Sequence, residues 1–247
     1  MMTGTDLLLH GFAGTGRSWD PVIQAAADPQ WRPNAPDLSG HGAASIRGEE
    51  GIGQVAAGLS ERYAPAGTLA GYSMGGRIAL RMALDRPGCA ERLVLVSMSP
   101  GIEDPGDRER RRKEDDALAA RFERMSPEEI ADLWLAGPLF AGDPPEAQQR
   151  AREQILACEP AALAQALRQL GPGVMEPMWE RLGELQVPVT IVVGERDERY
   201  REIAGRMATE IPQAEVVVIP GAGHALPRAA PEALAAVIAP GAARGAR

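Results

Sequence analysis

The chain has 247 residues, of which 45% are hydrophobic and 24% charged, and its net charge is −8. This composition excludes a disordered or fibrous protein and fits one large core with room for a small appended subdomain. The negative charge disfavours nucleic acid and anionic membranes as partners, and no stretch reaches the ~18 apolar residues of a membrane span. Because the two cysteines, Cys89 and Cys158, are too few for a disulfide scaffold, we expect no export and a cytoplasmic protein.

Short apolar runs alternate with Ala- and Leu-rich segments along the chain. The runs are predicted to be strands and lie at residues 5–10, 31–38, 68–72, 92–98, 189–194 and 215–219. The predicted helices between and after them lie at residues 51–63, 74–86, 199–210 and 231–239. Such alternation indicates a parallel sheet covered on both faces. We therefore predict an α/β fold with a mostly parallel sheet of about six strands.

The alternation is interrupted once, after the fourth predicted strand. From about residue 101 to residue 182 the sequence is charged, amphipathic and helical, with Gly-Pro and Pro-Pro pairs between segments. Ser126-Pro127-Glu128-Glu129 is a capping box that begins a helix carrying Trp134. We expect a core in two parts, residues 1–100 and 183–247, with residues 101–182 inserted between them as a helical cap.

A Gly-x-Ser-x-Gly motif, Gly71-Tyr72-Ser73-Met74-Gly75, lies where a predicted strand gives way to a predicted helix. A serine at such a turn has a strained backbone, and glycines on both sides keep Cβ atoms out of the way. The Ser73 hydroxyl then projects from the carboxyl edge of the sheet. This context predicts Ser73 as a catalytic nucleophile or base; a chance turn in a chain with 28 glycines is the alternative.

A serine hydroxyl is a weak base and nucleophile unless an imidazole takes its proton. His224 follows the last predicted strand and so lies at the same sheet edge as Ser73. Asp197, in Gly194-Glu195-Arg196-Asp197, is the predicted acid that fixes the imidazole tautomer, and Glu195 is its competitor. The chain order Ser, acid, His is the order of α/β-hydrolase triads.

The sequence His10-Gly11-Phe12 ends the first predicted strand. A backbone N–H from this loop and the N–H of the residue after the serine can form an oxyanion hole. The candidate donors are therefore the amides of Phe12 and Met74. We expect His10 and His41 to organise loops.

Together these motifs resemble the α/β-hydrolase superfamily over nearly the whole chain. Within it, the chain is most similar to one branch, the 2-succinyl-6-hydroxy-2,4-cyclohexadiene-1-carboxylate (SHCHC) synthases of menaquinone biosynthesis. The similarity lies in residues 71–77, in Ser99-Pro100-Gly101-Ile102 with the arginine-rich segment after it, and in Trp134 with Pro138-Leu139-Phe140. In that family the triad removes a proton and pyruvate is eliminated. The resemblance implies a carbon–oxygen lyase acting on 2-succinyl-5-enolpyruvyl-6-hydroxy-3-cyclohexene-1-carboxylate.

The resemblance also implies a small-molecule polycarboxylate as substrate. Arg77 lies one helical turn after the serine, and Arg108 and Arg111 match the family's Arg-x-x-Arg, so we expect an arginine clamp for carboxylates. For Arg108 and Arg111, the alternative is a basic helix face that is exposed to solvent. Tyr72 and Trp134 are the other expected substrate contacts. We expect no metal and no organic cofactor, because the sequence contains no ligand cluster or phosphate loop.

The sequence departs from the family pattern at four places: Ser39 replaces a proline, Leu135 stands where some members carry tyrosine, residues 151–160 lack an asparagine pattern, and Pro227-Arg228 replaces an acidic continuation.

Two other functions stay open. One is a hydrolase that cleaves an ester, lactone or C–C bond of a carboxylated small molecule, with Ser73 as covalent nucleophile. The other is a non-catalytic ligand-binding protein. The sequence does not predict the oligomeric state.

Overall fold

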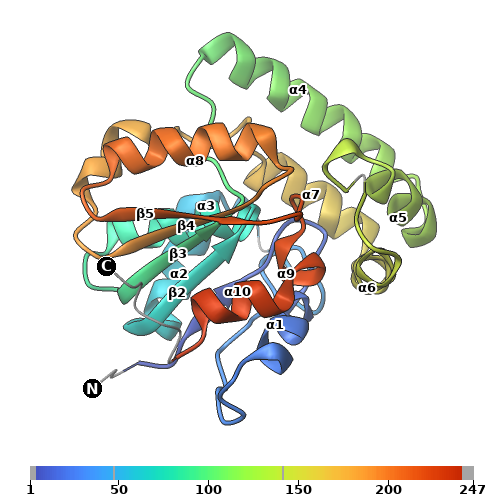
Figure 1. Ribbon diagram of the computed structural model, residues 1–247. Helices are drawn as coiled ribbons and strands as arrows, with labels where there is room; N and C mark the ends of the chain where they lie inside the picture. Colours follow the sequence, from blue (N-terminus) through green and yellow to red (C-terminus); the bar gives the residue numbers. More distant parts are fainter. Residues whose placement is uncertain (1–3, 47, 141, 241–247) are drawn as a thin grey trace.

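The computed structural model describes residues 4–46, 48–140 and 142–240 and contains one parallel sheet (Figure 1). Its five strands follow the order β1-β2-β3-β4-β5. They are β1 (Leu7–Leu9), β2 (Ala66–Tyr72), β3 (Ala90–Val96), β4 (Val189–Gly194) and β5 (Ala214–Ile219). Strands β1, β2 and β4 are buried along their whole length, as expected when helices cover both faces. The predicted α/β fold is confirmed.

Helices cover the two faces of the sheet unequally. Side chains of α2 (Ile52–Tyr63), α3 (Met74–Asp85) and α8 (Glu198–Glu210) pack on one face, and those of α1 (Asp20–Ala25) and α10 (Pro231–Ile238) pack on the other. The short elements η1 (Gly16–Trp19) and α9 (Leu226–Ala229) lie beside the second face. Leu7 and Leu9 belong to the first core and Leu8 to the second, which is the alternation of a strand buried on both sides.

The strand predicted at residues 31–38 is wrong, and the sheet has five strands instead of six. Asn34 makes a single bridge to Leu7, in which its N–H donates to the Asp6 carbonyl (2.7 Å) and its carbonyl accepts from the Leu8 N–H (2.8 Å). Pro33 and Pro36 flank this bridge and have no N–H to donate, so the ladder cannot continue.

The chain between β3 and β4 is helical, and we call residues 105–184 the insertion. It contains α4 (Pro105–Phe122), α5 (Pro127–Leu135), η2 (Pro138–Phe140), α6 (Pro145–Leu156), α7 (Pro160–Leu170) and η3 (Trp179–Glu184). Since residues 31–38 form no strand, the insertion follows the third strand and not the fourth. The predicted capping box is present, because the Ser126 hydroxyl accepts from the Glu129 N–H and the Glu129 carboxylate accepts from the Ser126 N–H.

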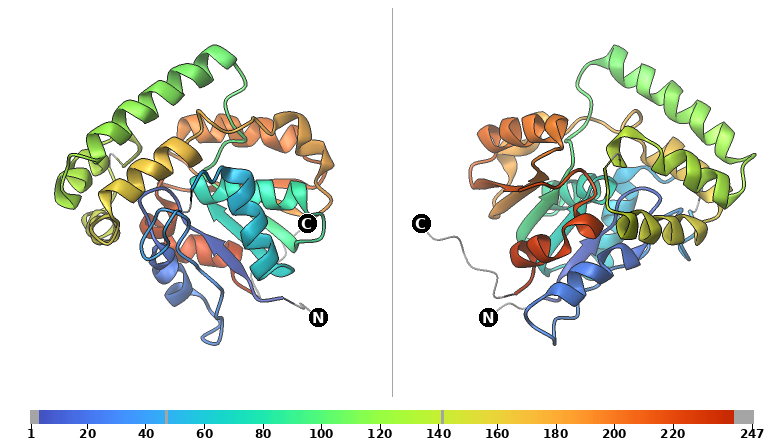
Figure 2. Two further views of the ribbon diagram at one scale, coloured as in Figure 1. Left: turned by 180° about the vertical axis from the view of Figure 1, so that it is seen from behind. Right: turned by 45° about the vertical axis from the view of Figure 1, so that its right-hand side comes forward.

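Helices α4, α5, α6 and α7 of the insertion pack on one another at the carboxyl edge of the sheet, and Figure 2 shows α4 extending beyond the body of the molecule. Phe122, Ile130 and Leu163 centre a small separate core, which the loop residue Ala13 joins from the sheet side. Among the described residues, no helix is both long enough and apolar enough to cross a membrane.

Candidate active site

Ser73 occupies a strained turn between β2 and α3. Its backbone has φ 51° and ψ −109°, a conformation that L-residues rarely adopt. A Cβ at Gly71 would lie 2.3 Å from the Gly75 carbonyl oxygen, and one at Gly75 would lie 2.2 Å from the Leu9 carbonyl oxygen. Both glycines are therefore required for this turn, which holds the Ser73 side chain at the sheet edge.

Ser73, His224 and Asp197 form a continuous chain of hydrogen bonds. The Asp197 Oδ2 lies 2.8 Å from His224 Nδ1, and His224 Nε2 lies 3.4 Å from Ser73 Oγ. Because a carboxylate can only accept, Nδ1 carries the proton and Nε2 is free to accept the one on the serine hydroxyl. Asp197 and His224 are buried, at 7% and 3% exposure, so water does not compete for the bond between them.

Glu195, the competing acid, does not reach the imidazole. Its carboxylate accepts from the Gly221 N–H at 2.8 Å and so closes the loop that carries His224. Asp197 is the N-cap residue of α8, but its side chain caps no helical N–H and points to His224 instead.

A cavity of about 660 Å³ opens directly on Ser73. Phe12 and Met74, the expected oxyanion donors, both line it. The Met74 amide is the first of α3, where no helical carbonyl can accept its hydrogen. The wall is otherwise largely apolar, formed by α4, α5 and α7 of the insertion and by Met98 of the sheet edge. In the described ranges, no group of three or more His, Cys, Asp or Glu side chains is placed to hold a metal ion.

Two of the three predicted clamp arginines line this cavity. Arg77 donates only to the Met175 sulfur, at 3.6 Å, and pairs with none of the described carboxylates. Its burial lowers the pKa of the guanidinium to about 10, with the nearby Arg111 adding to this effect. Arg111 donates from Nε to Asp115 Oδ1 at 2.8 Å, and burial raises the pKa of Asp115. Arg77 is therefore a cavity cation that forms no ion pair with the described residues, and the charge of the nearby Asp115 offsets it only in part.

The other predicted contacts divide into those at the cavity and those beside it. Trp134 lines the cavity and packs on Phe12, with ring centroids 4.9 Å apart. Tyr72 is buried behind His224, at a centroid distance of 5.4 Å, and lines a smaller neighbouring cavity. Arg108 lines neither cavity, since its Nη1 donates to the Ile102 carbonyl at 3.1 Å in the loop before α4.

Two cavity residues, Arg199 and Tyr200, were missed in the sequence. The Tyr200 ring lies 4.6 Å from the His224 ring. Both residues belong to the first turn of α8, directly after the predicted acid, Asp197. Their position was the available signal, because a helix that begins at the carboxyl edge of the sheet presents its first turn to the site.

His10 and His41 hold the loops below the cavity. His10 Nε2 accepts from the Leu38 N–H at 2.9 Å, and Nδ1 lies 2.8 Å from the Gly11 carbonyl. The His41 ring packs edge-on against both His10 and Phe12. Burial lowers the pKa of His10 to about 4 and of His41 to about 3, so both rings are neutral at pH 7. Neither ring lines the cavity.

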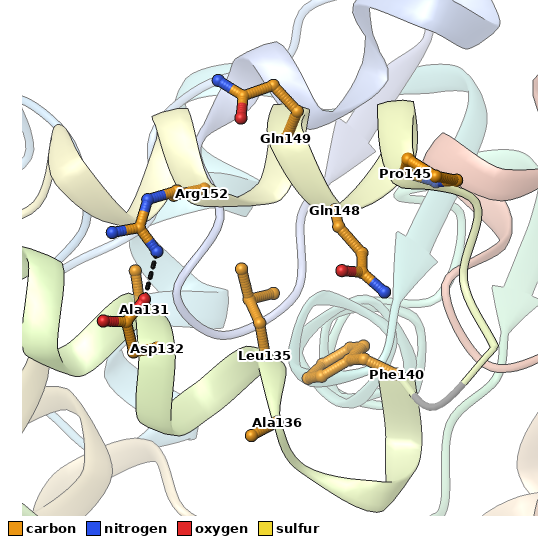
Figure 3. Close-up of a pocket in the computed structure, with 9 residues that line it drawn as sticks. All are labelled: Ala131, Asp132, Leu135, Ala136, Phe140, Pro145, Gln148, Gln149 and Arg152. Carbon is orange, nitrogen blue, oxygen red and sulfur yellow. Dashed lines mark hydrogen bonds and ion pairs between the residues drawn. The ribbon is translucent and has the colours of Figure 1, made fainter.

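A second hollow, of about 590 Å³, lies between α5 and α6 on the outside of the insertion (Figure 3). Leu135 and Phe140 point into it, and Arg152 of α6 pairs with Asp132 of α5 across one end. It is more open than the first and has no serine, cysteine or histidine in its wall. Of the described lining residues, Phe140 alone is shared with the Ser73 cavity, which we therefore take as the candidate active site.

Comparison with known proteins identifies the family of the chain. The profile of the alpha/beta hydrolase family matches residues 7–237. The SHCHC synthase of Enterobacter sp. (strain 638) is 31% identical, over 94% of this chain and 89% of that protein. Protein PHYLLO of Arabidopsis thaliana is 32% identical, but the chain spans only 14% of its length.

Solved structures agree with the sequence matches. MenH from S. aureus superposes with a TM-score of 0.88 at 32% identity, covering 96% of this chain and 92% of that one. A thermophilic esterase from Thermogutta terrifontis, with malate bound, has a TM-score of 0.77 at 29% identity, covering 95% of this chain and 89% of the esterase.

Proposed function

Because the chain belongs to the alpha/beta hydrolase family, we propose that it is a pyruvate-eliminating lyase of the SHCHC synthase type, acting in menaquinone biosynthesis. The single observation that carries the proposal is the part-buried Arg77, which shares a cavity with Ser73 and forms no ion pair with a carboxylate among the described residues. A neutral ester would leave this guanidinium desolvated and uncompensated. A ligand carboxylate would satisfy it. The similarity to SHCHC synthases supplies the substrate, which carries three carboxylates.

The reaction uses the hydrogen-bonded chain as a proton relay. Ser73 Oγ removes the ring proton next to the succinyl ketone while His224 Nε2 takes the hydroxyl proton. The electron pair moves into the ring, the C–O bond to the enolpyruvyl group breaks, and a second ring double bond forms. The imidazolium returns its proton to the departing enolpyruvate, which tautomerises to pyruvate, so atoms and charge balance.

Charge develops on the ketone oxygen when the ring proton leaves. The amides of Phe12 and Met74 are the donors that would stabilise it, since both residues line the cavity beside Ser73. Asp197 stabilises the imidazolium and stays ionised. Trp134 and the apolar wall exclude water, which favours elimination over hydrolysis.

A direct assay of pyruvate release from 2-succinyl-5-enolpyruvyl-6-hydroxy-3-cyclohexene-1-carboxylate tests the proposal. We expect turnover by the wild type, and Ser73→Ala to lower kcat by about 10³-fold or more with little change in ligand binding. Ser99→Ala is the matched control, because Ser99 also lines the cavity but its hydroxyl contacts the Gly101 backbone and no histidine. Absence of pyruvate refutes the lyase.

A hydrolase is the second candidate, favoured by the 29% identity to the Thermogutta terrifontis esterase. In that case Ser73 would attack a carbonyl and form an acyl-enzyme. A rapid burst from p-nitrophenyl esters, with no pyruvate formed from the cyclohexene substrate, would establish this activity in place of elimination. Tight binding without turnover of either substrate would instead indicate a ligand-binding protein.

A further inference from the structure

We propose that Arg199, on the first turn of α8, is the third cation of the site and binds the carboxylate of the departing pyruvyl group. This inference rests on the proposed function. Among the described residues that line the cavity, three are charged and all are arginines: Arg77, Arg111 and Arg199. The first two come from α3 and α4, whereas Arg199 comes from α8, which follows the loop of Asp197.

Arg199 is free to take a ligand. Its guanidinium lies 6.0 Å from the centre of the Tyr200 ring and has no hydrogen bond or ion pair within the described part of the chain. The other arginines of α8 are occupied, because Arg201 donates to the Glu195 carbonyl at 3.1 Å and Arg206 pairs with Glu103. The one unpaired arginine of this helix is thus the one that lines the cavity.

The position of Arg199 is unfavourable without an anion. A cation on the first turn of a helix opposes the helix dipole. The N-cap residue gives no compensation, since the Asp197 side chain points to His224 and caps no N–H of α8, and Glu198 is the one acidic side chain of the first turn. A carboxylate bound at Arg199 would offset both effects.

The assignment to the pyruvyl carboxylate follows from the place of His224. The departing enolpyruvate takes its proton from His224 in the proposed reaction and must therefore lie beside that ring. Tyr200 packs against His224 with ring centroids 4.6 Å apart, and Arg199 is its neighbour in the chain. Arg108, expected from the sequence to be part of the clamp, is held on loop carbonyls outside the cavity. The third carboxylate is thus assigned to Arg199 and not to Arg108.

Charge-deletion variants test the role with two independent readouts. In the pyruvate assay, we expect Arg199→Gln to raise KM for the trianionic substrate about tenfold or more. Inhibition by the dianionic product SHCHC, which lacks the pyruvyl group, should stay within about twofold of wild type. Arg199→Lys should restore part of the loss, and Arg201→Gln, on the same helix but outside the cavity, should behave as wild type. Equal losses for substrate and product would overturn the assignment.

The second readout does not need turnover. Isothermal titration calorimetry compares propane-1,2,3-tricarboxylate with glutarate, which lacks its central carboxylate. We expect the wild type and Arg201→Gln to prefer the tricarboxylate by about tenfold, and Arg199→Gln to lose that preference. No preference in the wild type, or one that Arg199→Gln keeps, overturns the proposal. Loss of the preference in a protein that releases no pyruvate would retain the Arg199 site and refute the lyase alone.

Discussion

The sheet edge and the insertion both line the Ser73 cavity, but they hold their functional groups by different means. On the sheet edge, backbone packing fixes Ser73, and the buried pair of Asp197 and His224 is hydrogen-bonded from loops that follow strands. In the insertion, Arg111 is positioned by a side chain on its own helix, Asp115, and Arg111 remains 37% exposed. The candidate reacting groups thus depend on rigid strand ends, whereas the candidate binding groups are supplied partly by helices packed against them.

The largest expected effect lies at the serine turn. Gly71→Ala should lower the free energy of unfolding by about 3 kcal/mol or more, because the new Cβ would lie 2.3 Å from a carbonyl oxygen of the backbone. Urea denaturation measures this change. The matched control is Gly205→Ala in α8, where the added Cβ meets nothing within 4 Å. That variant should gain ~0.5–1 kcal/mol from helix propensity. Equal stabilities of the two variants would show that the turn is not sterically constrained.

Substitutions of single arginines compare how much the sheet edge and the insertion contribute to the binding affinity. Arg77→Gln should weaken binding of SHCHC by ~1.5–3 kcal/mol, roughly 10- to 150-fold, because a charge-assisted hydrogen bond to a ligand carboxylate is lost. Arg111→Gln should have a smaller effect, since this guanidinium is part-exposed and already paired with Asp115. Arg108→Gln should bind within about twofold of wild type. Calorimetric titration measures the affinity for SHCHC in all three variants. A larger loss of affinity in Arg108→Gln than in Arg77→Gln would contradict the prediction.

A smaller effect, on the pH dependence of the free energy of unfolding, is expected from His10 in the loop below the cavity. The pKa of His10 is lowered from 6.5 to about 4, so the unfolded chain binds more protons than the folded chain between these values. Its contribution to stability is present above pH 6.5 and is lost as the pH falls toward 4, at about 1.4 kcal/mol per pH unit. Urea denaturation at pH 6.5, 5.5 and 4.5 measures the slope.

His10→Gln is the control for that slope and should reduce it by about 1.4 kcal/mol per pH unit, leaving the part that comes from His41, whose pKa burial also lowers. If this variant does not fold, the wild-type His10 ring can be followed by NMR instead. Protonation of the ring would remove its acceptor for the Leu38 N–H. Titration of His10 near pH 6.5 in the folded protein would contradict the prediction.

Much of the fold, and the meeting of the three candidate catalytic residues, could be predicted from the sequence. Gly71, Ser73 and Gly75 form a local motif, and His224 and Asp197 each follow a strand in a parallel sheet, whose carboxyl ends meet at one edge. Topology therefore brings them together without knowledge of side-chain packing. The strand predicted at residues 31–38 was wrong for a local reason, since its apolar pattern outweighed two prolines that cannot donate to a ladder.

The arginines that line the cavity were harder to predict, because packing decides which face of a helix points toward the cavity. Arg108 and Arg111 lie three positions apart on α4, so the sequence predicts the same face for both, yet only Arg111 lines the cavity. No sequence motif indicated that Arg199 would line the cavity. By itself, the sequence determined the parallel sheet and the three residues that meet at its edge, because strand order and loop position suffice for that. Only the tertiary structure decided which arginines face the cavity, since this depends on how the insertion and α8 pack around it.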